Sequence, residues 1–181
     1  MNILVVCTGN TCRSPMTEAL LRAKLDALAV DARVHSAGTL PWIGAASNGA
    51  RAAMREYGLD LDAHRSRALS AELLDDADLV LGMTRQHVWS VANYAPAAVE
   101  RAFLVGEVIR LGTTAGPRAV DEPLRAWATR VATLRADPRV PGQPQDEVAD
   151  PAGESLEVYR ATAARLDAEL DRLVSLLAGT T

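Results

Sequence analysis

Several kinds of residue and segment are scarce in this chain of 181 residues. Two cysteines are too few for the disulfide framework of a small secreted domain. No apolar run approaches the roughly 18 residues that a membrane span needs, so we expect no membrane partner. The first residues show neither a basic segment nor a small-residue cleavage site. We therefore read no signal peptide and expect a cytoplasmic protein.

Basic charge is not in excess either. The formal net charge is −4 at pH 7, whereas nucleic-acid-binding modules usually carry a basic surplus, so we expect no nucleic-acid partner. The remaining composition, with 49% hydrophobic and 23% charged residues, is that of an ordinary globular protein. A chain of this length is expected to form one domain, spanning residues 1–181.

Short apolar segments alternate with helical patterns along the chain. We predict strands at residues 2–6, 34–38, 79–83 and 102–104, and helices at 14–29, 47–57, 71–76, 84–91 and 155–177. The alternation predicts an α/β fold: a four-stranded parallel sheet with about five helices on both faces, in three layers. The stretch from 112 to 149 holds five prolines and reads as irregular, apart from an amphipathic piece at 124–134 with Trp127. We interpret residues 113–146 as an insertion that forms a lid or a mobile segment.

The end of the first predicted strand carries the most informative motif, Cys-Thr-Gly-Asn-Thr-Cys-Arg-Ser at residues 7–14. Between a strand and a helix, the backbone N–H groups of residues 8–13 can turn inward and bind an anion, and the helix dipole adds positive potential. Gly9 permits a tight turn, and Asn10 tolerates a left-handed conformation. Arg13 offers a planar fork for phosphate oxygens.

Cys7 lies at the strand end, where doubly wound sheets bind ligands. The nearby N–H groups favour its thiolate, and a thiolate beneath a bound phosphoryl group can attack phosphorus in line. The leaving group then needs a general acid, and two aspartates that precede proline, Asp137 and Asp150, are candidates. We favour Asp150 because it directly precedes the last long helix, whereas Asp137 lies in the insertion.

The segment Cys7–Met16 resembles the signature of the low-molecular-weight protein tyrosine phosphatases. The resemblance continues at 36–38, at 78–83 and at Asp150-Pro151, and it covers residues 1 to about 112 and 147 to 178. It implies a hydrolase that acts on phosphorylated proteins through a cysteinyl-phosphate intermediate, without metal or cofactor. We expect a monomer or a weak dimer.

The resemblance also implies roles for individual residues. Cys7 would be the nucleophile, Arg13 would bind phosphate and stabilise the transition state, and Asp150 would act first as acid and then as base. The loop that binds phosphate would comprise Thr8, Gly9, Asn10, Thr11, Cys12 and Ser14. Asn10 and Ser14 would hold the loop and the thiolate, with Ser36 and His64 in the supporting network.

One branch of the family acts on phosphoarginine and carries threonine before the second cysteine, where tyrosine phosphatases usually carry isoleucine or valine. Here that residue is Thr11, and the stretch Met83–His87 is also similar to that branch. An aliphatic side chain packs against a phenyl ring, whereas a hydroxyl suits a guanidinium. We therefore favour phosphoarginine over phosphotyrosine. Relatives usually carry an aromatic residue after Asp-Pro, but Ala152 stands here, so we expect Trp42 or the insertion to wall the pocket.

Other interpretations stay open at this point. Cys12 either packs at the loop or, by the resemblance, forms a reversible disulfide with Cys7. Trp42 is a pocket wall or an ordinary surface or core aromatic. Arg65 and Arg67 are expected to lie in a solvated turn or to contact acidic substrate segments.

Two distant functions share this motif. Arsenate reduction would need further cysteines, which the chain lacks, and a non-catalytic phosphate-binding module would not need Cys7, Arg13 and Asp150 together. A metal site would need ligands beyond the two cysteines, and the three histidines are scattered, so none is expected.

Overall fold

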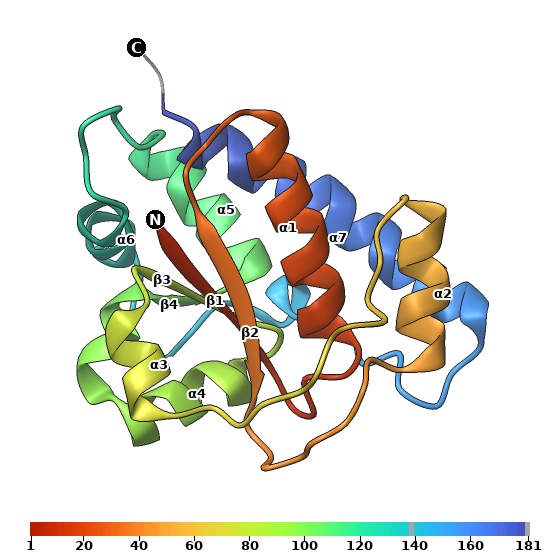
Figure 1. Ribbon diagram of the computed structural model, residues 1–181. Helices are drawn as coiled ribbons and strands as arrows, with labels where there is room; N and C mark the ends of the chain where they lie inside the picture. Colours follow the sequence, from red (N-terminus) through yellow and green to blue (C-terminus); the bar gives the residue numbers. More distant parts are fainter. Residues whose placement is uncertain (138–139, 180–181) are drawn as a thin grey trace.

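The protein is described here from a computed structural model that covers residues 1–137 and 140–179. In this part of the chain four parallel strands form one sheet in the order β2-β1-β3-β4 (Figure 1). The strands are β1 (Asn2–Cys7), β2 (Arg33–Gly38), β3 (Leu79–Gly82) and β4 (Ala102–Leu104). Because all four run in the same direction, their carboxyl ends meet at one edge of the sheet. The predicted four-stranded parallel sheet is confirmed.

The side chains of β1 show why both faces of the sheet are covered. Ile3 and Val5 belong to one apolar cluster, whereas Leu4 and Val6 belong to another, because successive side chains of a strand point to opposite faces. All four of these side chains are fully buried. The result is the predicted arrangement of helix, sheet and helix in three layers.

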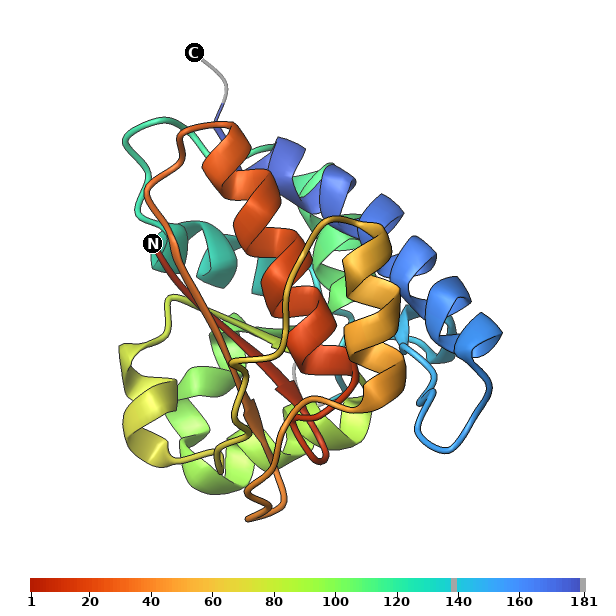
Figure 2. The same cartoon turned by 45° about the vertical axis from the view of Figure 1, so that its right-hand side comes forward.

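Each cluster is completed by its own helices, which Figures 1 and 2 show on opposite sides of the sheet. The first is lined by α1 (Arg13–Ala27), α2 (Asn48–Glu56), α5 (Val105–Ala115) and α7 (Leu156–Leu177). The second is lined by α3 (Ala71–Asp76), α4 (Arg85–Tyr94) and the 3-10 helix η1 (Pro96–Arg101). None of the helices in residues 1–137 and 140–179 is long and apolar enough to cross a membrane.

The segment predicted as irregular contains more helix than expected. The described residues form seven α-helices rather than about five. The two that were not predicted are α5 (Val105–Ala115) and α6 (Leu124–Ala132). A second 3-10 helix, η2, covers Pro144–Asp146. The side chain of Trp127 on α6 is fully buried in the first cluster. Pro138, which follows Asp137, lies outside the described residues, and the insertion at 113–146 stays a prediction.

Candidate active site

The loop formed by residues 8–12 joins β1 to α1 at the carboxyl edge of the sheet. The end of the neighbouring strand β2 packs directly against this loop at Gly38. A Cβ atom at Gly38 would lie 2.8 Å from the carbonyl oxygen of Thr8 and 3.1 Å from the backbone nitrogen of Asn10. Only glycine therefore allows strand and loop to approach this closely.

Asn10 connects the loop to three other segments. It is fully buried and adopts a left-handed φ of 51°, as expected from the sequence. Its amide nitrogen donates to Ser14 Oγ at 2.9 Å and to Ser36 Oγ at 2.7 Å, and its amide oxygen accepts from the backbone N–H of Arg67 at 3.1 Å. His64 Nε2 lies 2.8 Å from the Asn10 carbonyl oxygen and donates to it. These bonds fix the loop from α1, from β2 and from the 64–67 segment.

Arg67 extends this network rather than lying in a solvated turn, so that prediction is wrong for Arg67. Its guanidinium donates from Nε to the carbonyl oxygen of Ser36 at 2.8 Å and from Nη2 to His35 Nδ1 at 2.5 Å. Burial, and then the charge of Arg67, lower the pKa of His35 to about 4, so His35 is a neutral acceptor. Ser36 Oγ in turn donates to Glu18 Oε2 at 2.5 Å. Arg65 is exposed, as predicted, but it lies in an isolated antiparallel bridge with Ala45 rather than in a turn.

The sulfur of Cys7 faces two polar groups at the base of the loop. It accepts from the backbone N–H of Asn10 at 3.2 Å and lies 3.0 Å from Ser14 Oγ. Ser14 Oγ already accepts from Asn10 Nδ2, so its own proton is available to the sulfur. Cys7 is buried, and hydrogen-bond donors directed at its sulfur stabilise a thiolate.

Arg13 connects the loop to the segment of Asp150. Its side chain is 4% exposed, and it donates from Nη1 to the carbonyl oxygen of Val148 at 3.2 Å and from Nη2 to Asp150 Oδ2 at 2.5 Å. Arg13 Nε is buried and has no hydrogen-bond partner among the described residues. A buried donor without an acceptor is costly, and an oxyanion held by the loop would satisfy it.

The segment that carries Asp150 is fastened to the start of α4. The backbone N–H of Val148 donates to the carbonyl oxygen of Met83 at 2.8 Å, and Glu147 Oε1 accepts from the backbone N–H and from Nε of Arg85 at 3.0 and 2.9 Å. These bonds hold the pKa of Glu147 below its usual value. The side chain of Asp150 is 46% exposed and also accepts from the backbone N–H of Ala152 at 3.1 Å.

His87 is a contact of the loop that the sequence reasoning did not single out. Its Nε2 lies 3.0 Å from Thr8 Oγ1, and its Nδ1 accepts from the backbone N–H of Thr84 at 3.0 Å. Burial, and then the charge of Arg13, lower the pKa of His87 to about 4. The signal in the sequence is the position of His87 three residues after the N-cap Thr84, from which a side chain reaches back to the cap.

The second cysteine lies on the other side of the loop. Cys12 Sγ donates to Ser47 Oγ at 3.3 Å and lies 3.4 Å from the hydroxyl of Tyr159. Thr11 Oγ1 lies 3.6 Å from the same sulfur. Burial raises the pKa of Tyr159. Both cysteines are free thiols here, so packing and protection both stay open as roles for Cys12.

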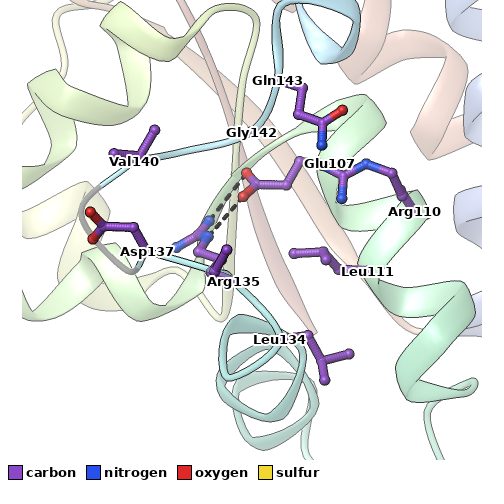
Figure 3. Close-up of a pocket in the computed structure, with 10 residues that line it drawn as sticks. Glu107, Arg110, Leu111, Leu134, Arg135, Asp137, Val140, Gly142 and Gln143 are labelled. Atoms are coloured by element: carbon purple, nitrogen blue, oxygen red, sulfur yellow. Dashed lines mark hydrogen bonds and ion pairs between the residues drawn. The ribbon is translucent and has the colours of Figure 1, made fainter.

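The remaining candidates lie apart from this network. Trp42 is 59% exposed on the loop after β2, where its carbonyl oxygen accepts from Ser66 Oγ at 3.0 Å, so it is not a core residue. Asp137 lines a pocket of about 360 Å³ formed by α5, residues 134–137, and Val140, Gly142 and Gln143, with the ion pair of Glu107 and Arg135 in its wall (Figure 3). None of the described residues that line this pocket belongs to the loop of residues 8–12. The structure thus brings Asp150, and not Asp137, to Arg13.

Comparison with known proteins identifies the family. The sequence model of the family "Low molecular weight phosphotyrosine protein phosphatase" matches residues 2–130. A protein-arginine-phosphatase of Geobacillus stearothermophilus is 34% identical over 176 residues, which are 97% of this chain and 95% of the relative. The low molecular weight protein-tyrosine-phosphatase Ptp of Acinetobacter johnsonii is 41% identical over 106 residues, which are 58% of this chain and 72% of the relative.

A solved structure agrees over nearly the whole chain. The YwlE arginine phosphatase, in a mutant with a phosphorylated active-site serine, superposes with a TM-score of 0.75 at 30% identity and covers 97% of this chain and 94% of its own. The chain therefore belongs to the low molecular weight phosphotyrosine protein phosphatase family. It is accordingly an enzyme of the hydrolase class.

Proposed function

We propose that the whole chain, residues 1–181, acts as one cysteine-dependent protein phosphatase domain that hydrolyses phosphoarginine. The observation that carries this proposal is the pairing of Cys7 with Arg13 at one loop. The sulfur receives hydrogen bonds at the base of the loop, while the buried Nε of Arg13 lacks an acceptor among the described residues. A phosphoryl group bound above the sulfur satisfies that nitrogen and places phosphorus in line for attack.

The first chemical step transfers the phosphoryl group to the enzyme. The thiolate of Cys7 forms the S–P bond, and the bond from phosphorus to the leaving nitrogen or oxygen breaks. Asp150, which has left Arg13 and taken up a proton from solvent, gives that proton to the leaving atom. The N–H groups of the loop and Arg13 stabilise the charge on the three equatorial oxygens.

The second step regenerates the thiolate. Asp150, now a carboxylate, takes a proton from water, the oxygen of water bonds to phosphorus, and the S–P bond breaks to release phosphate. Asp150 leaves Arg13 before the first step, when the substrate binds, because the bound phosphoryl oxygens compete for the same guanidinium. Its half-exposed position supports such a movement. Gly9, Asn10, Thr11, Cys12 and Ser14 hold the loop in this proposal, and Ser36 and His64 support it.

Thr11 supports phosphoarginine as the substrate class, because its hydroxyl stands in the loop at a position where an aliphatic side chain would pack against a phenyl ring. The relatives include both activities: the protein-arginine-phosphatase of Geobacillus stearothermophilus matches 97% of this chain, and the structure of a protein tyrosine phosphatase from T. tengcongensis covers 98% of it. In this proposal Thr11 selects the guanidinium, and Trp42 or the 113–146 segment forms the outer wall of the pocket.

The decisive measurement is kcat/KM for phosphoarginine and phosphotyrosine peptides of matched sequence, for the wild type, Thr11→Ile and Thr11→Ser. We expect the wild type to prefer phosphoarginine, Thr11→Ile to erase the preference, and Thr11→Ser to keep its direction. A wild-type preference for phosphotyrosine would leave the cysteine chemistry in place and assign specificity to Trp42 and the 113–146 segment. The cytoplasmic location and the monomeric or weakly dimeric state stay predictions of the sequence.

A further inference from the structure

The turn between β3 and α4, together with the first turn of α4, contacts both halves of the proposed active site. On one side, Met83 and Arg85 bond the segment that carries Asp150. On the other side, the buried ring of His87 reaches the hydroxyl of Thr8, the residue that follows the nucleophile. Among the described residues of this region, His87 is the titratable group that reaches the loop of residues 8–12.

The protonation of His87 follows from its neighbours. A backbone N–H can only donate, so the bond from Thr84 N leaves Nδ1 without a proton. The charged groups that act on the ring are Arg13, Asp150 and Glu147, and burial together with Arg13 outweighs the two carboxylates in lowering the pKa. The ring is therefore neutral at pH 7 with its single proton on Nε2, which donates to Thr8 Oγ1.

The hydroxyl of Thr8 then has a defined direction. Its oxygen accepts from His87 Nε2 at 3.0 Å and faces Arg13 Nη2 at 3.5 Å. With its oxygen turned toward two donors, the hydroxyl must direct its own proton to a third group. Arg13 Nη2 also bonds Asp150, so the Thr8 hydroxyl lies beside the guanidinium that would bind the phosphoryl group.

We propose that His87 is a positioning residue that orients the Thr8 hydroxyl to donate a hydrogen bond to the phosphoryl group in the transition state. This inference rests on the proposed function. A donor that is oriented in advance costs no reorganisation when charge develops on the phosphoryl oxygens. The contribution therefore falls mainly on kcat and only weakly on KM.

Two substitutions of His87 separate this role from a structural one. In His87→Asn the amide oxygen can still accept from Thr84 N, so the start of α4 is kept, but the side chain is too short to reach Thr8. In His87→Gln the amide nitrogen takes the place of Nε2 and can donate to Thr8. We expect His87→Asn to lower kcat about 10-fold with KM nearly unchanged, and His87→Gln to recover most of that loss.

Thr8→Val completes the test, because it removes the hydroxyl through which His87 acts. The double variant with His87→Asn should be no slower than the slower single variant, since both changes remove the same interaction. Gln86→Ala, an exposed position on the same helix, controls for general effects on α4. All variants are assayed on the phosphopeptides above, with Cys7→Ser as the baseline.

A second measurement does not depend on how the variants fold. Nitrogen-15 spectra of the wild type at pH 7 should show a neutral His87 ring protonated on Nε2. A proton on Nδ1, or a cationic ring, would overturn the inference. The inference would also be overturned if the wild type is active and His87→Asn has the same kcat. It would be overturned as well if the fold-losses in kcat of Thr8→Val and His87→Asn multiply in the double variant. A wild type without phosphatase activity would instead overturn the proposed function and this inference together.

Discussion

The two loops that meet at Arg13 are held in opposite ways. The loop of residues 8–12, which we propose to bind phosphate, is anchored by Asn10, which is fully buried and bonded to α1, β2 and the 64–67 segment. The carboxylate of Asp150 is nearly half exposed and bonded to Arg13 and to the backbone N–H of Ala152. In the proposed reaction, the loop that meets the developing charge is therefore fixed, whereas the carboxylate that transfers a proton can change partners.

This difference matches what each loop has to do in the proposed reaction. Dipoles that stabilise developing charge are most effective when they need not reorganise, which favours a buried and fully bonded loop. A general acid that protonates one atom and later deprotonates water must reach two positions, which favours an exposed side chain on a tethered segment. Breaking either property should therefore have different consequences.

The largest effect is expected from Cys7→Ser. Replacing the thiolate by a neutral hydroxyl should lower turnover of phosphopeptides by at least about 10⁴-fold, because the nucleophile acts as one unit with its acid and its binding loop. Phosphate release under single- and multiple-turnover conditions measures the loss. Retained turnover would contradict the cysteinyl-phosphate mechanism.

Asp150→Ala tests the mobile loop. We expect kcat to fall by about 10²–10⁴-fold on a substrate whose leaving oxygen needs a proton. The loss should be much smaller on p-nitrophenyl phosphate, whose leaving group departs without protonation. Glu154→Ala, a change of an exposed carboxylate four residues later, is the matched control. Equal losses on both substrates would show that Asp150 does not act as the acid.

Asn10→Ala tests the fixed loop. The change leaves the hydrogen-bond partners of Asn10 unsatisfied and places alanine at a positive φ. The free energy of unfolding should therefore fall by about 2–4 kcal/mol, and kcat should fall with it. Asn10→Gly relieves the backbone strain but does not restore the lost hydrogen bonds, so it should recover only about 1 kcal/mol of the lost stability. Urea unfolding at pH 7 measures both. Full recovery in Asn10→Gly would mean that the side-chain bonds contribute little.

The smallest effect concerns pH and the histidine behind the fixed loop. The pKa of His35 is about 4 in the folded protein against 6.5 in its unperturbed state. Its contribution to stability is therefore fully present above pH 6.5 and is lost as the pH falls toward 4, by about 1–3 kcal/mol. Urea unfolding at pH 7, 5.5 and 4.5 should show a shallower decline for His35→Asn. An identical decline would exclude His35 as the titrating group.

The sequence was most informative where function depends on contiguous residues. The strand, the loop and the helix that contain residues 2–27 could be predicted because the anion site is built from successive backbone groups. Among the partners that hold the loop, Ser36 and His64 were expected from the resemblance alone. Gly38, Arg67 and His87 were not expected as contacts of the loop, since they reach it from three distant segments. Their spacing along the chain carries no signal of their proximity.

The helix α5 was missed for a related reason. Gly106 and Gly112 lower its intrinsic helix propensity, so the segment looks irregular in isolation. A Cβ atom at Gly112 would lie 3.0 Å from the ring of Trp127 and 3.0 Å from Leu176. The glycine that obscures the helix in the sequence is thus the residue that lets α6 and α7 pack against it. Tertiary packing outweighs the local preference here.

If the chain acts as proposed, the bond between Asp150 and Arg13 has one more consequence, for the release of inorganic phosphate. In the absence of an anion the carboxylate occupies the guanidinium, so inorganic phosphate must displace an internal competitor in order to bind. Its apparent affinity is therefore lower than the loop alone would give, in proportion to the fraction of molecules in which Arg13 is unoccupied. In the proposed reaction, Asp150 releases its proton to solvent as phosphate departs, returns to Arg13 as a carboxylate and opposes rebinding. We therefore expect the contact that holds the general acid near the site to reduce product inhibition as well.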